Sequence, residues 1–298
     1  MEENEKKGEI MKQKYKGIIC IVLSAFCFAL MNVFIRMAGE LPSVQKSFFR
    51  NLVAFFFALV IIKKEGVHFS GDRNNLVLLV IRSLFGTMGI LCNFYAVDHL
   101  VLADASMLSK MSPFFAILFS YFLLKEKVSL VQGIAVAGAF VGSLLIIKPT
   151  GFDLTRLPAV IGLLGGLGAG VAYTFVRIIG KRGEKGPFIV CFFSGFSLLV
   201  MLPMLLASYQ SMSIKQFAIL MLCGLAAAGG QFSITAAYCY APAKEISVFD
   251  YSQIVFSAIF GFVLFGQVPD LYSWLGYLVI CGMGIWMFLY QKREVHST

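Results

Sequence analysis

The sequence repeats when it is aligned with a copy of itself shifted by 141 positions, the shift that superposes Phe34 on Phe175. Identical residues coincide at this one shift from the first apolar segment to the last, without a gap. Each copy contains an odd number of membrane-length apolar segments, so the second copy must enter a membrane from the opposite side. We therefore predict an inverted repeat, which many secondary transporters use to build a central site that opens alternately to each face. The other coinciding pairs are Arg36 and Arg177, Gly39 and Gly180, Gly89 and Gly230, Ala96 and Ala237, Ser106 and Ser247, Phe115 and Phe256, Phe119 and Phe260, Leu123 and Leu264, and Leu130 and Leu271.

The composition is that of a helical membrane protein. Hydrophobic residues make up 59% of the chain and charged residues 14%, with a mean hydropathy of +0.83. A soluble domain would carry roughly a quarter charged residues. We predict an all-α membrane protein with ten transmembrane helices in two inverted five-helix repeats. The expected spans lie near 17–38, 44–62, 75–97, 102–124, 128–147, 157–178, 187–207, 216–239, 245–265 and 271–290.

The repeats divide the chain into two large units. Residues 17–149 form the first five-helix repeat and residues 157–290 the second, with short connections that leave no room for a soluble domain. Residues 1–16 are expected to be a cytoplasmic N-terminal tail and residues 291–298 a cytoplasmic C-terminal tail. Small residues cluster at 162–170 and 224–230, which is typical of close helix packing in membranes.

The formal net charge of +9 orients the protein and does not indicate nucleic-acid binding. With the N-terminus in the cytoplasm, most lysines and arginines fall on inner segments, as the positive-inside rule requires. Both termini are therefore predicted to lie on the cytoplasmic side of the cell membrane. The inner cations are Lys6, Lys7, Lys12, Lys14, Lys16, Lys63, Lys64, Arg73, Lys125, Lys127, Lys181, Arg182, Lys185, Lys244, Lys292 and Arg293.

A polar stripe runs along the expected third span. Arg82, Gly86, Gly89 and Asn93 follow one another at intervals of four, three and four residues and so share one helical face. Two interpretations remain open: the stripe is one wall of a cavity, or it is a tight helix seam from which Arg82 reaches toward the cytoplasm. The eighth span carries the same intervals in Gly224, Ala228, Gln231 and Thr235.

The fourth and ninth spans present opposite charges at nearly the same depth. Lys110 aligns with Tyr251 across the repeat, and Asp250 and Gln253 lie beside Tyr251. Ionisable residues at membrane depth usually face the protein interior. Lys110 and Asp250 form either a structural salt bridge or part of a wet cavity that handles a charged solute, and a pair that breaks on substrate arrival satisfies both. Pro113 predicts a kink in the fourth span.

Three further residues are candidate binding groups. Arg50 lies one or two turns into the second span and could line an outer vestibule. Asn32 and Tyr173 align with each other across the repeat, each in the middle of a span, and are candidate cavity groups.

Several stretches resemble the EamA family of the drug/metabolite transporter superfamily, most closely residues 81–89 and 94–149. The second copy, at 236–276, fits more loosely, with Ile254 in the place of the proline and Phe265-Gly266-Gln267 in that of the acidic ending. The resemblance covers nearly the whole chain and implies ten helices in two inverted repeats and transport of small organic solutes. The positions that match the family pattern are Arg82, Gly86, Tyr95, Ala96, Ala105, Pro113 and Leu124-Lys125-Glu126.

The expected function is secondary active transport of a small organic metabolite by alternating access. Intramembrane cations outnumber acids, which favours an anionic or zwitterionic solute. The alternatives are a proton-coupled exporter of drugs or lipophilic compounds and a membrane-embedded enzyme. The sequence disfavours the enzyme, because its three histidines lie in loops or the tail and it shows no metal or cofactor motif. The expected partners are the solute, the lipid bilayer, and a coupling proton or an exchanged solute.

Overall fold

The computed structural model describes residues 2–66, 73–124, 129–147, 157–240 and 247–297. Some sequence predictions lie outside these ranges, among them the first residues of the ninth span and the motif residues Lys125 and Glu126. The described residues form helices and short turns, with no strand among them. The helices are α1 (Glu2–Met37), α2 (Ser43–Glu65), α3 (Arg73–His99), α4 (Leu102–Ser109), α5 (Ser112–Leu124), α6 (Leu130–Ile147), α7 (Leu157–Lys181), α8 (Gly186–Ser208), α9 (Ile214–Tyr240), the 3-10 helix η2 (Ser247–Tyr251), α11 (Ser252–Phe265) and α12 (Leu271–Ser297).

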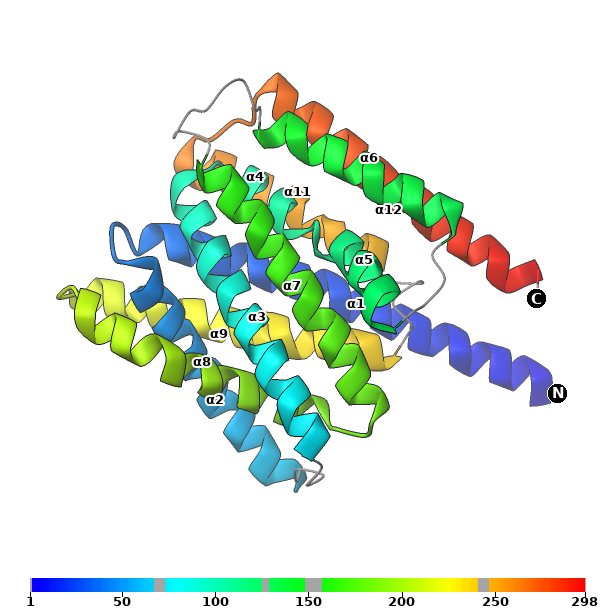
Figure 1. The fold of residues 1–298 in the computed structure, drawn as a ribbon, viewed down its shortest axis with the longest axis horizontal. Coiled ribbons are helices and arrows are strands. Elements are labelled where there is room, and N and C mark those ends of the chain that lie inside the picture. The colour runs from blue at the N-terminus through cyan, green and yellow to red at the C-terminus, as the bar shows by residue number, and fades with distance from the viewer. Residues whose placement is uncertain (1, 67–72, 125–128, 148–156, 241–246, 298) are drawn as a thin grey trace.

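The predicted fold class is confirmed. Nine segments of the described chain are long and apolar enough to cross a membrane, when α4 and α5 are taken together, and the shorter apolar segment Phe249–Phe265 supplies a tenth. Large apolar side chains cover the outer surface, where lipid would surround them: Leu130 is 81% exposed and Ile214 89%. Both chain ends lie on the same side of the molecule (Figure 1), as an even number of crossings requires.

The contacts between the two repeats come in matched pairs. α1, the first helix of the first repeat, packs along α9, the third helix of the second repeat. In the same way α3, the third helix of the first repeat, packs along α7, the first helix of the second. The second helices, α2 and α8, pack on each other, and so do the fifth helices, α6 and α12, along one edge of the molecule (Figure 1). This exchange of partners is what a two-fold relation between the repeats requires.

Glycines bring α3, α4 and α7 close together. A Cβ atom at Gly165 would lie 3.2 Å from the Gly89 carbonyl oxygen, and one at Gly168 would lie 2.8 Å from the Phe85 carbonyl oxygen. A Cβ atom at Gly166 would lie 2.5 Å from the Leu108 carbonyl oxygen. The small-residue cluster at 162–170 therefore packs helices, as predicted, and allows backbone-to-backbone contact that any side chain would prevent.

The fourth span is broken where a kink was predicted. α4 ends at Ser109, α5 begins at Ser112, and Lys110 and Met111 connect them. Pro113 has no N–H group, and its ring clashes with the carbonyl four residues earlier, which favours a kink or a break in the helix at this point. Pro113 instead occupies the first turn of α5, where a missing N–H group costs nothing.

The ninth span changes its helical winding near the equivalent position, although it has no proline there. Residues Ser247–Tyr251 form a 3-10 helix, and α11 begins at Ser252, which aligns with Met111 in the first repeat. Discontinuous helices such as α4–α5 line binding sites in many transporters.

Candidate functional site

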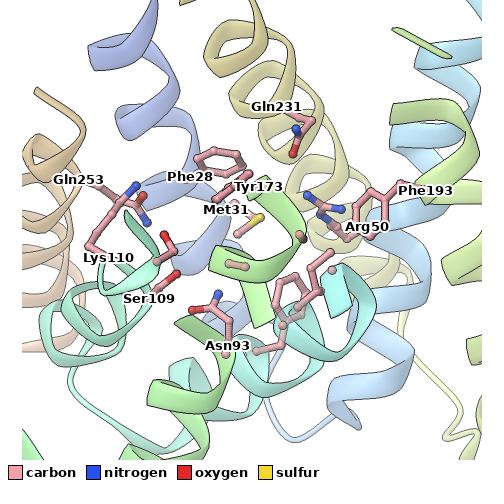
Figure 2. Close-up of a pocket in the computed structure, with 18 of the residues that line it drawn as sticks. Phe28, Met31, Arg50, Asn93, Ser109, Lys110, Tyr173, Phe193, Gln231 and Gln253 are labelled. Atoms are coloured by element: carbon pink, nitrogen blue, oxygen red, sulfur yellow. The ribbon is translucent and has the colours of Figure 1, made fainter. Parts of the chain in front are cut away.

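A cavity of about 110 Å³ lies between the two repeats at the level of the break between α4 and α5. Its lining combines aromatic and apolar groups with three cationic side chains and one carboxylate. Figure 2 shows Arg50 and Phe193 on one side of it and Lys110 and Gln253 on the other, with Phe28, Met31 and Tyr173 between them. The lining residues are Phe28, Met31, Arg50, Arg82, Gly86, Gly89, Ile90, Asn93, Phe94, Ser109, Lys110, Ser112, Gly165, Ala169, Ala172, Tyr173, Phe193, Gln231, Asp250 and Gln253.

Two buried arginines flank one aromatic ring on the α2–α3–α8 side. The Cζ atom of Arg82 lies 3.7 Å from the ring centroid of Phe193, and that of Arg50 lies 6.0 Å from it. Arg50 also donates from Nη1 to Asn51 Oδ1 at 2.7 Å. Arg50 Nε and Arg82 Nε and Nη1 have no hydrogen-bond partner among the described residues. These N–H groups are therefore buried donors whose hydrogen-bonding capacity the described residues leave unsatisfied.

The opposite side of the cavity holds a buried ion pair. Lys110 Nζ donates to Asp250 Oδ2 at 2.7 Å, and both residues are less than a tenth exposed. The second carboxylate oxygen, Asp250 Oδ1, has no partner among the described residues. Gln253, one turn along α11, lines the cavity beside the pair. This side can offer a hydrogen-bond acceptor and, if the pair opens, a cation.

The lining follows the two-fold relation, but its cations do not. Ser109 and Asp250 are equivalent across the repeat, as are Ser112 and Gln253, and all four residues line the cavity. The three cations come from the first repeat. Their equivalents in the second repeat are uncharged: Arg50 aligns with Cys191, Arg82 with Cys223 and Lys110 with Tyr251.

Most of the candidate residues from the sequence line this cavity: Arg50, Arg82, Asn93, Lys110, Tyr173, Gln231, Asp250 and Gln253. Arg82 faces the cavity and is 4% exposed, which favours the cavity interpretation of its stripe over the seam. Arg50 lines the same central space, deeper than the outer vestibule expected for it.

Two candidates lie outside the lining. Asn32 Nδ2 donates to Ser106 Oγ at 3.2 Å, and Ser106 Oγ lies 2.7 Å from Ser257 Oγ, so Asn32 belongs to a polar cluster between α1, α4 and α11. Tyr251 packs against α12, where its ring fills the space beside Gly284.

Sequence reasoning missed Phe193, Phe28, Met31 and Ser109. Ser109 carried a usable signal, since it aligns with Asp250 across the repeat. The two phenylalanines carried none, because the chain has 30 phenylalanines and most expected spans contain several.

A polar network joins α1, α2 and α3 at one end of the helix bundle. Lys46 Nζ lies 2.6 Å from Asp98 Oδ1, and Lys46 is 1% exposed. Ser43 Oγ donates to the other oxygen of Asp98 at 3.3 Å. Arg36 donates to the carbonyl oxygens of Val97 and Leu100 at the end of α3. The positive-inside analysis assigns this end to the outer face.

Further bonds at that end join the two repeats. The side chain of Gln45 and the backbone of Gln210 exchange two hydrogen bonds, of 2.9 and 3.1 Å. Gln267 Oε1 accepts from the backbone N–H of Leu102, the first residue of α4. Gln216 Nε2 donates to the carbonyl oxygen of Ala38. These bonds hold both repeats together on this side of the cavity.

A helical bundle of two inverted repeats around a buried polar cavity defines a class, the membrane transporters that open a central site to each face in turn. Within the described residues, no group of three or more His, Cys, Asp or Glu side chains is placed to hold a metal ion. The chain belongs to the EamA-like transporter family, whose sequence model matches residues 15–148 and again residues 158–290. It is a multi-pass membrane protein that transports small molecules.

Relatives from several organisms match almost the whole chain. The pseudopaline exporter of Pseudomonas aeruginosa is 30% identical over 89% of this chain and 93% of the relative. The riboflavin transporter of Brucella anthropi is 28% identical over 93% of this chain and 99% of the relative. Human solute carrier family 35 member G1 is 25% identical over 90% of this chain and 78% of the relative. A solved crystal structure with 17% identity superposes with a TM-score of 0.66 over 95% of this chain and 98% of that chain, so the two share a fold.

Proposed function

We propose that this protein is a secondary active transporter that moves a small organic anion or zwitterion across the cytoplasmic membrane by alternating access. The central cavity is its solute site. One observation carries the proposal: Arg50 and Arg82 line the cavity, are buried, and have N–H groups without a partner among the described residues. An anionic group of the solute would supply the missing partner.

The charge balance of the cavity supports an anion. Arg50, Arg82 and Lys110 against Asp250 leave an excess of two positive charges. A cation at membrane depth costs about 2.5–3.5 kcal/mol on insertion scales. An arriving anion offsets part of that cost, and charge-assisted hydrogen bonds to an arginine contribute roughly 1.5–3 kcal/mol. A cationic solute would meet repulsion in the same place.

The size of the cavity supports a small solute. One water needs roughly 10–15 Å³ of such space, so a cavity of about 110 Å³ holds on the order of eight to ten water-sized groups. The names of the relatives, which mention pseudopaline and riboflavin, support an organic metabolite as the solute.

The Lys110–Asp250 pair is proposed to take part in transport. Asp250 accepts a hydrogen bond from Lys110 with Oδ2 only. Its other oxygen, Oδ1, can bind a proton or accept a hydrogen bond from the solute. A coupling proton on Asp250 would release Lys110, whereas an exchanged solute would compete for the same groups. Either event changes the charge between α4 and η2.

A second candidate is proton-coupled export of drugs or lipophilic compounds. The aromatic and apolar part of the lining favours it, because Phe28, Met31, Phe94 and Phe193 could contact a ring system. The buried arginines oppose it for lipophilic cations. The two candidates therefore differ in the charge of the solute that they require.

A ligand screen tests the proposal. The purified protein is heated in the presence of each member of a metabolite library, because a ligand that binds the folded state raises the unfolding midpoint by mass action. We expect stabilisation by organic acids or zwitterions, and uptake of the same compounds by proteoliposomes. Robust transport of a quaternary ammonium dye, with organic acids inert, would favour the second candidate.

A further inference from the structure

The ring of Phe193 stands where a buried arginine usually has an acidic partner. Arg82 is 4% exposed and Phe193 3%, and the guanidinium carbon lies 3.7 Å from the ring centroid. A guanidinium over an aromatic face is attracted by the negative charge of the ring face. It is also weakly hydrated and stacks well on flat surfaces. The ring thus stabilises the cation without using the N–H groups at its edge.

Three nitrogen atoms of the two guanidiniums lack a partner in the described part of the chain, although Arg50 Nη1 donates to Asn51 Oδ1. Arg82 Nε and Nη1 and Arg50 Nε have no hydrogen-bond partner among the described residues. A carboxylate partner would have occupied a guanidinium edge, since arginine and carboxylate pair through two parallel N–H···O bonds. The unpaired N–H groups of the two guanidiniums suit an incoming carboxylate or phosphate, because each of its oxygens can accept one of them.

A glycine on α3 makes room for the ring. A Cβ atom at Gly86 would lie 2.9 Å from Phe193 Cε2 and 3.5 Å from Arg82 Nη1. Real Cβ atoms do not approach a ring carbon so closely, so a side chain at this position would displace Phe193. Gly86 and Arg82 are one helical turn apart, which places the glycine directly beside the arginine.

We propose that Phe193 is a positioning residue for the solute and takes the place of a counter-ion beneath Arg82. It holds the guanidinium groups of Arg50 and Arg82 without using Arg50 Nε or Arg82 Nε and Nη1, and these N–H groups bind an oxyanion of the solute. This inference rests on the proposed function. It adds the group that is recognised, a carboxylate or phosphate, and the side of the cavity on which that group binds (Figure 2).

The test compares oxyanion probes with neutral compounds of the same shape. Thermal unfolding of the purified protein is followed against acetate, benzoate and inorganic phosphate, with acetamide and benzamide as neutral counterparts. The variants are Phe193→Leu and Phe193→Tyr, with Phe28→Leu as a matched control. Phe28 lines the same cavity, but its ring packs against Gly230 of α9. Comparison of the carboxylates with phosphate shows which oxyanion the site prefers.

We expect Phe193→Leu to bind the oxyanion probes about three- to thirtyfold more weakly, the loss of one desolvated cation–π contact. Amide responses should stay as in the wild type. Phe193→Tyr should restore oxyanion binding, and Phe28→Leu, which removes another ring of the same cavity, should change oxyanion and amide binding alike. If Phe193→Leu does not fold, Gly86→Ala serves instead, because it displaces the ring and should cause the same selective loss.

Two results would overturn the inference. If the wild type and Phe193→Leu bind the oxyanions equally, Phe193 does not position the arginines, although the proposed function stands. An equal loss of oxyanion and amide binding in Phe193→Leu and Phe28→Leu would mean that both rings only shape the cavity. If the wild type binds no oxyanion, the proposed function fails first and this inference falls with it.

Discussion

Lys110 Nζ lies 2.7 Å from Asp250 Oδ2; Lys110 stands at the break between α4 and α5, and Asp250 lies in η2, just before α11. The pair therefore connects the fourth span of the first repeat with its equivalent in the second. Because the repeats must move relative to one another in alternating access, a bond at this point would be made and broken during transport. A purely structural bond would instead persist throughout the cycle.

Neutral variants of the pair distinguish these roles. If the pair serves the solute, Lys110→Met and Asp250→Leu should each reach the membrane folded yet fail to transport, and the double variant should stay inactive. If the pair is only structural, each single variant leaves a buried charge unpaired, at a cost of about 3–5 kcal/mol. The double variant should then recover both stability and uptake. We expect the first result, measured as uptake normalised to folded protein, and normal uptake by the double variant would contradict it.

The ion pair between Lys46 and Asp98 joins α2 and α3 at the end of the bundle assigned to the outer face. We predict that Asp98→Asn shifts the protein toward a state open on the outer face, because it weakens a charge-assisted bond worth roughly 1.5–3 kcal/mol. A cysteine introduced at Ser109, in the cavity lining, reports the change. An impermeant thiol reagent should label it several-fold faster in intact cells. Lys215→Gln, which removes an exposed cation from the same end, is the control, and equal rates in both variants would refute the prediction.

Close packing of α7 against α4 predicts a large effect of one methyl group. Gly166→Ala places a Cβ atom 2.5 Å from the Leu108 carbonyl oxygen and should destabilise the protein by about 1–3 kcal/mol. Gly133→Ala, on α6, places its Cβ atom in open space and should leave the unfolding midpoint unchanged or slightly raised. Thermal unfolding of both variants measures the difference, and equal midpoints would show that this contact relaxes freely.

The fold could be predicted from the sequence because long apolar runs identify membrane helices, and the repeat indicates their number and direction. The irregularities of the fourth and ninth spans were only partly predictable. Pro113 marks one through its missing N–H group. The change from 3-10 to α winding at Ser252 has no such marker, because hydropathy carries no information about how a turn is wound.

The charged residues of the candidate site could be predicted from the sequence, because a charge in a membrane span is costly. The uncharged residues could not be predicted in this way. Arg82, Lys110 and Asp250 are conspicuous in an apolar span, and each lies on the cavity. Asn32 was placed on the cavity because it lies mid-helix, yet a helix in a bundle has several buried faces, and its face meets Ser106 instead. Phe193 looks like any phenylalanine that faces lipid. Its role depends on which side chains of α2 and α3 reach it, and that is a property of the tertiary fold.

The orientation of the protein is a separate prediction. A single cysteine at position 215 should react with an impermeant reagent in intact cells, whereas one at position 182 should react only after the membrane is permeabilised. Both positions are exposed at opposite ends of the bundle. The wild type is the control, because its seven cysteines lie within the expected spans. Labelling of position 182 from outside would reverse the topology.

The central claim is that a solute anion binds to the buried arginines of the cavity, and equilibrium binding to matched arginine variants tests it most directly. Arg82→Gln removes a cation from the cavity, and Arg73→Gln removes one from the exposed start of the same helix. For the organic anion that stabilises the wild type most, Arg82→Gln should bind about tenfold to 100-fold more weakly, and Arg73→Gln as tightly as the wild type. Unchanged binding by Arg82→Gln would contradict the account.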